Sequence, residues 1–193
     1  MKTLQFCQLP PGAGIIRPDY ERLEHVEMDS PAIKVMTDLR KVKAVTAPPH
    51  ATLGNVHEHM IHNGVRMVLV TDAEHRLIGL LTATDLLGPR PLQAARELDI
   101  PHDQLRVEHI MTPAPRVQVL NYLDVTHADV QEIVGTLRDA ERHHALVLEK
   151  DDNGRPLIRG IFSLTQIERQ LGVHLEPTRA AHNLSEITRE LSS

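Results

Sequence analysis

Residues 77–86 read Leu-Ile-Gly-Leu-Leu-Thr-Ala-Thr-Asp-Leu, an apolar run that is followed by hydroxyl side chains and a carboxylate. The run is typical of a β-strand, and Thr82 or Thr84 suits the N-cap of a helix that opens at Asp85. Residues 157–167 read Leu-Ile-Arg-Gly-Ile-Phe-Ser-Leu-Thr-Gln-Ile and repeat the pattern, with Gln166 in place of the aspartate. The two stretches therefore indicate an internal duplication.

The duplication extends toward the N-terminus of each stretch. Val35-Met36-Thr37 matches Ile110-Met111-Thr112, and residues 65–70 match residues 142–147. Met36 lies 49 positions before Asp85, whereas Met111 lies 55 positions before Gln166. We expect most of this difference at a turn, where Asp-Asp-Asn-Gly-Arg-Pro at 151–156 replaces the shorter His75-Arg76.

Each copy predicts the order β-α-β-β-α. The first copy predicts strands at 42–45, 65–71 and 76–82, a helix at 52–63 and a second helix from Asp85. The second copy predicts strands at 117–120, 144–149 and 157–162 and helices at 127–140 and 164–171. Outside the copies, we expect short helices at 92–98 and 183–191 and an extended arm, residues 1–30, that covers a sheet edge.

Composition excludes several classes of protein. The 193 residues carry a formal net charge of −5 and include two Phe, two Tyr and no Trp, which argues against a nucleic-acid-binding surface. No apolar run approaches the roughly 20 residues of a membrane span. Cys7 is the only cysteine, which excludes an internal disulfide. The first residues lack the apolar core of a signal peptide, so we expect a cytoplasmic protein.

Together, the Met-Thr openings, the Gly-Val-Arg-x-x-x-Val strand and the closing Gly-x-x-Thr-x-x-Asp-Leu resemble the cystathionine β-synthase (CBS) domain, and two copies resemble a CBS pair, or Bateman module. The resemblance implies an α/β fold of tandem CBS motifs packed through their sheets with pseudo-twofold symmetry. It divides the chain into an N-terminal arm (1–32), motif 1 (33–88), a linker (89–106), motif 2 (107–171) and a C-terminal tail (172–193).

The resemblance also implies a function. CBS pairs are regulatory modules that bind AMP, ADP, ATP or S-adenosylmethionine between their motifs and signal to a protein partner, and they commonly form homodimers. We therefore expect a stand-alone regulatory protein that needs no cofactor besides this ligand. The alternative is an interaction module whose nucleotide sites are degenerate, which Gln166 favours.

In the first site implied by the resemblance, Asp85 binds the ribose hydroxyls and Thr82 lies near a phosphate. The cleft is shared between motifs, so the remaining candidates come from both of them: Leu80, Arg116, Val117, His143 and His144. Thr82 and Asp85 could instead serve only as helix caps. The second site departs from the family pattern, because Gln166 offers a ribose no charge-assisted hydrogen bond. Its other candidates are Arg66, Ile161 and Ser163.

The 13 histidines do not predict a metal site. His59 and His62 share one face of the predicted helix, but His57 points elsewhere and no third ligand is evident. His143 and His144 point to opposite faces of a strand, and we expect one of them to make phosphate affinity pH-dependent. Cys7 has no neighbouring base, and no nucleophile–base or phosphate-cradling motif is present, so we expect no enzymatic activity.

Overall fold

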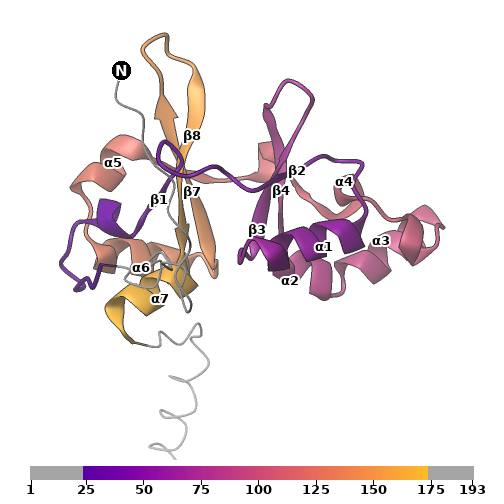
Figure 1. Cartoon of the computed structure of the whole chain (residues 1–193), viewed down its shortest axis with the longest axis horizontal. Helices are drawn as coiled ribbons and strands as arrows, with labels where there is room; N and C mark the ends of the chain where they lie inside the picture. The colour runs from indigo at the N-terminus through magenta and orange to yellow at the C-terminus, as the bar shows by residue number, and fades with distance from the viewer. Residues whose placement is uncertain (1–23, 174–193) are drawn as a thin grey trace, which may run out of the picture.

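The computed structural model describes residues 24–173, which form two lobes, each with a sheet and its own helices (Figure 1). The elements in chain order are η1 (Ala32–Val35), β1 (Thr37–Asp38), β2 (Thr46–Ala47), α1 (Leu53–His62), β3 (Met67–Thr71), β4 (Leu77–Thr82), α2 (Ala83–Leu87), α3 (Arg90–Leu98), η2 (His102–Gln104), α4 (Val107–Ile110), β5 (Thr112–Pro113), η3 (Ala114–Arg116), β6 (Val119–Asn121), α5 (Tyr122–His127), α6 (Val130–Asp139), β7 (His144–Lys150), β8 (Pro156–Ser163) and α7 (Leu164–Leu171). This α/β architecture of two similar halves confirms the predicted fold class.

Each sheet takes its outer strand from the other copy of the repeat. One sheet has the order β2-β3-β4-β5, and the other has the order β1-β8-β7-β6. Thus β5, at the start of the second copy, pairs with β4 through Leu80 and Thr112, and β1 pairs with β8 through Thr37 and Ile161. The two halves therefore exchange strands, which ties each lobe to the other.

The two faces of strand β3 contribute to two different clusters of buried apolar side chains. Val68 and Val70 pack among the helices of their own lobe, whereas Met67 and Leu69 pack with Leu146 of β7 in the other sheet. Successive side chains of a strand point to opposite faces, so one face supports the helices and the other meets the second sheet. The predicted packing of the motifs through their sheets is thus confirmed.

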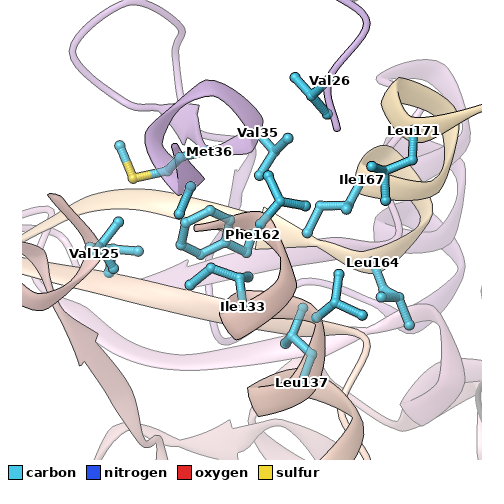
Figure 2. Close-up of a cluster of buried hydrophobic side chains, with 14 residues drawn as sticks. Val26, Val35, Met36, Val125, Ile133, Leu137, Phe162, Leu164, Ile167 and Leu171 are labelled. Atoms are coloured by element: carbon cyan, nitrogen blue, oxygen red, sulfur yellow. The ribbon is translucent and has the colours of Figure 1, made fainter. Parts of the chain in front are cut away.

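The lobe of the second copy is centred on Phe162, which is completely buried (Figure 2). Val35 and Met36, from the start of the first copy, pack around it with Ile133 of α6 and Ile167 of α7. The described part of the N-terminal arm continues this contact, since the Val26 N–H donates to the Gln170 carbonyl of α7 at 3.1 Å. Residues 24–31 therefore lie against α6 and α7, and the expected cover of a sheet edge is wrong for this part.

The β3–β4 and β7–β8 hairpins turn in the same way. Asp72 accepts hydrogen bonds from the backbone N–H of Glu74 and of Arg76, and Asp151 accepts them from Asn153 and Arg155. The turns are equal in length, so the expectation of a longer turn is wrong. Most of the difference lies in the strands, because β7 and β8 have 7 and 8 residues and β3 and β4 have 5 and 6.

Most of the predicted elements are confirmed within a few residues, but several begin later than predicted. The segment 42–45 is irregular because the Asp38 carbonyl accepts from both Lys41 and Val42, and the strand follows as β2. Helix α6 starts at Val130 because Asp129 caps it through Glu132, and strand β6 starts two residues later than predicted. The predicted helix at 183–191 lies outside the described residues.

Two glycines allow the exchanged strands to dock. A Cβ on Gly79 would lie 2.8 Å from the Met111 sulfur and 2.8 Å from the Thr112 carbonyl oxygen, and a Cβ on Gly160 would meet the Met36 side chain. We predict that Gly79→Ala destabilises the protein by about 1–3 kcal/mol, because β5 must move away. Thermal unfolding measures the effect.

Gly54→Ala is the matched control for that substitution. Gly54 lies in α1 and has nothing within 4 Å of its Cβ position, so alanine should stabilise the helix by about 0.5–1 kcal/mol. A Gly79→Ala protein as stable as the wild type would contradict the docking role of Gly79.

Candidate functional site

A cleft of about 420 Å³ lies where the two sheets meet, a volume suited to a small molecule. Its lining comes from both copies and includes all seven residues predicted for the first site, which are Leu80, Thr82, Asp85, Arg116, Val117, His143 and His144. The exchange of strands explains this meeting, because β5 brings the start of the second copy beside β4.

Thr82 and Asp85 form a capping box at the start of α2. The Asp85 Oδ2 accepts from the Thr82 backbone N–H at 2.9 Å and from its hydroxyl at 2.7 Å, and the Asp85 N–H donates to the Thr82 Oγ1 at 3.2 Å. The structure therefore confirms that Thr82 and Asp85 cap a helix, as considered from the sequence. Capping does not use all the acceptor positions of the Asp85 side chain, because an ionised carboxylate has about four of them.

Arg90 is a site residue that the sequence did not reveal. Its Nη1 lies 2.9 Å from the Asp85 Oδ1 and donates to the Ile110 carbonyl at 3.1 Å and to the Thr112 hydroxyl at 3.3 Å. Arg90 thus joins the closing motif of the first copy to the opening of the second. The sequence offered one signal for Arg90, which is its position five residues after Asp85 and directly after Gly88-Pro89.

The floor of the cleft is apolar. Met67 and Leu146 are buried at the contact between the sheets, and Leu80 and Val117 pack beside them. These side chains form a surface on which a flat apolar ring could lie without an aromatic partner.

The cleft is also rich in arginine. Arg66 and Arg142 line it from the starts of the β3 and β7 segments, and the Arg142 Nη2 donates to the Gln118 side chain at 2.7 Å. Arg66 was predicted for the second site, but the structure places it in the cleft with the residues of the first site. The reason is that the first residues of β3 and β7 face each other across the contact between the sheets.

His144 is a neutral side chain in this cleft. Burial is the largest cause, and together with the charges of His143 and Arg66 it lowers the pKa of His144 to about 4. The imidazole therefore keeps one charge state from about pH 5 upward. The pH-dependent phosphate affinity that we expected from this pair of histidines is not supplied by His144.

The remaining second-site candidates lie outside this cleft. The Gln166 Oε1 accepts a hydrogen bond from the Thr37 hydroxyl at 3.0 Å, and Ser163 makes no capping hydrogen bond with its side chain. Ile161 pairs with Thr37 in the exchanged strand. Thus Arg66 lines the cleft, whereas Ile161, Ser163 and Gln166 do not.

Charged side chains fill the region next to Thr37. Arg159, only 9% exposed, pairs with Asp38, lies 3.0 Å from the Glu149 Oε2, and stacks over the Tyr122 ring at 4.9 Å. Burial alone would raise the pKa of Asp38, but the Arg40 backbone N–H and the Arg159 guanidinium outweigh it and hold this pKa below its usual value. This ion-pair cluster has no counterpart in the other sheet, where Pro113 and Ile78 occupy the positions of Asp38 and Arg159.

Among residues 24–173, no group of three or more His, Cys, Asp or Glu side chains has the geometry of a metal site. His59 and His62 instead bond to Asn63 and to the Glu58 carbonyl within and beside α1. No helix in this part of the chain has the length and apolarity needed to cross a bilayer. Cys7 lies outside the described residues.

One segment of the chain matches a known protein family. A protein-family model described as "CBS domain" matches residues 32–88, and a search of curated proteins finds no match. An uncharacterized conserved protein from Pyrococcus horikoshii is 21% identical, with a TM-score of 0.55 over 79% of this chain and 100% of that one.

Two other solved structures share the fold. The CBS-domain protein ATU1752 from Agrobacterium tumefaciens is 20% identical, with a TM-score of 0.50 over 70% of this chain and 93% of that one. CBSX2, solved in complex with AMP, is 18% identical, with a TM-score of 0.51 over 72% of this chain and 94% of that one. At these identities the likeness shows the fold alone.

The lowered pKa of His144 predicts a pH dependence of stability. Between about pH 6.5 and pH 4 the unfolded chain binds a proton at His144 that the folded chain does not bind, so stability falls as the pH falls through this window. We expect His144→Gln to remove a loss on the order of 2 kcal/mol. Denaturant unfolding at pH 7 and pH 4.5 measures it.

His62→Gln, on the exposed side of α1, is the control and should keep the wild-type pH dependence. If the free energy of unfolding of His144→Gln fell between pH 7 and pH 4.5 as much as that of the wild type, the prediction that His144 is neutral would be wrong.

Proposed function

We propose that this protein binds an adenosine-containing ligand and regulates a protein partner. The match of residues 32–88 to a CBS domain model and the likeness in fold to the CBS-domain protein ATU1752 support this proposal. The observation that carries the proposal is the cleft itself, which gathers the seven first-site candidates from both copies. AMP, ADP, ATP and S-adenosylmethionine are the candidate ligands.

The chemistry of the cleft suits the parts of such a ligand. The apolar floor of Met67, Leu80 and Val117 can hold an adenine ring, and Asp85 retains about one acceptor position for a ribose hydroxyl. Phosphates would find arginine side chains at Arg66 and Arg116. The AMP complex of CBSX2, which has the same fold, supports this choice of ligand.

Regulation follows from the position of the cleft. A ligand there touches groups on both sheets, so its affinity depends on how the two lobes are arranged. A ligand that binds one arrangement better shifts the population toward it, and a partner that recognises that arrangement receives the signal. We place this activity in the cytoplasm and assign no catalysis to it.

The alternative is an interaction module with degenerate sites. It is favoured by the second-site region, where Gln166 bonds to Thr37 and the Asp38–Arg159 ion pair lies alongside. In that case a partner would bind equally well with and without any nucleotide.

Calorimetric titration of the folded protein with AMP, ATP and S-adenosylmethionine tests the proposal. We expect binding by at least one of them, and a loss of about 10- to 100-fold in affinity for Asp85→Ala, because hydrogen bonds to a charged group are lost. Gln166→Ala should change affinity much less.

Asp85→Asn keeps the size of the side chain and guards against a folding defect, since Asp85 also caps α2. A larger loss for Gln166→Ala than for Asp85→Asn would move the site to the other copy. A folded protein that binds none of the three compounds would leave the interaction module as the function.

We also propose that two copies associate through α1 and α2. Ile61 is 65% exposed on α1 and Leu87 is 70% exposed on α2, and the two helices contact each other. We predict that Leu87→Glu lowers the mass measured by sedimentation from dimer to monomer. Leu157→Glu, exposed at the other end of the lobes on β8, should leave the dimer intact, and a dimeric Leu87→Glu protein would contradict this surface.

A further inference from the structure

The side chains of the cleft carry more positive than negative charge. Two carboxylates, Asp85 and Glu141, line it together with four arginines, Arg66, Arg90, Arg116 and Arg142. A guanidinium does not lose its proton in a protein, so this excess is permanent. The excess does not depend on the histidines of the cleft.

Three of these arginines are available to an anion. Arg66, Arg116 and Arg142 are exposed, and within residues 24–173 none of them forms an ion pair. The hydrogen bond from Arg142 to the neutral amide of Gln118 leaves its charge uncompensated. Arg66 lies directly before β3, Arg116 is the last residue of η3, and Arg142 lies in the segment before β7.

Arg90 differs from the other three arginines of the cleft in its contacts. It is already paired with Asp85 at 2.9 Å and is fixed by its bonds to Ile110 and Thr112. The pair cancels the one carboxylate at the proposed ribose position, which would otherwise repel a phosphate nearby. The three remaining arginines outnumber the one remaining carboxylate, Glu141, so the field that a phosphate chain meets is positive.

We propose that this cleft selects adenosine di- and triphosphates over AMP and over S-adenosylmethionine, an inference that rests on the proposed function. Each phosphate beyond the first supplies anionic oxygens for another unpaired guanidinium, and such charge-assisted bonds are strong. S-Adenosylmethionine instead brings a sulfonium cation to a site that is already positive, and like charges at short range repel.

Competition titration of the full chain with ATP, ADP, AMP and S-adenosylmethionine tests the selection, in EDTA and at two salt concentrations. We expect affinity to fall about tenfold from ATP to ADP and again to AMP. S-Adenosylmethionine should bind more weakly than AMP. The preference for ATP should shrink in high salt, because the arginines are exposed and screened.

Arg116→Gln should weaken ATP about tenfold and leave the affinity for adenosine unchanged, since adenosine has no phosphate. Arg90→Gln should reduce the ratio of ATP to S-adenosylmethionine affinity, because it exposes the Asp85 charge. Arg96→Gln is the control: Arg96 is exposed on the same helix α3 and does not line the cleft, so the wild-type order should persist.

AMP or S-adenosylmethionine binding as tightly as ATP would overturn the selection and leave the proposed function standing. Equal weakening of ATP and adenosine by Arg116→Gln would also overturn it, since the arginine would then act on the fold. A folded chain that binds neither adenosine nor any of the four ligands would overturn the proposed function itself.

Discussion

The exchange of outer strands between the two copies is the constraint on which the rest of the structure depends. β5 completes the sheet of the first copy and β1 that of the second, and each docks where a glycine lets a methionine approach the sheet closely. Neither copy can complete its sheet alone. The same crossing carries Thr112 and Arg116 to the end of β4, so the cleft is a product of the exchange and belongs to neither copy.

The exchange also explains why two similar copies make two different sites. Equivalent positions receive different residues: Asp38 and Arg159 form a buried ion pair in one half, and Pro113 and Ile78 stand in the other. A buried ion pair is costly to break, because removing one partner leaves an unpaired charge. That half therefore has a fixed set of polar contacts beside Thr37, whereas the half with Asp85 and Arg90 presents an open cleft.

Features that depend on residues close together in the chain could be predicted from the sequence. The apolar runs, the Asn-Gly turn and the helix caps predicted most strands and helices, and the family resemblance predicted which residues meet at the first site. The strands β1 and β5 have two residues each, which is too short for an apolar pattern that would predict a strand. The start of α6 at Val130 depends on one capping residue, Asp129. Arg90 and the placement of Arg66 depend on long-range packing, which no spacing along the chain encodes.

Within residues 24–173, the contact between the sheets buries fewer apolar residues than the core of either lobe. The two lobes have clusters of 14 and 11 buried residues, but within the described chain the cluster between the sheets has three, Met67, Leu69 and Leu146. Burial of apolar surface stabilises roughly in proportion to area, so this contact contributes much less than either lobe. Two of its three buried residues also line the cleft. A ligand there adds contacts where the structure has fewest, and so it can bias the arrangement of the lobes without disturbing the core of either one.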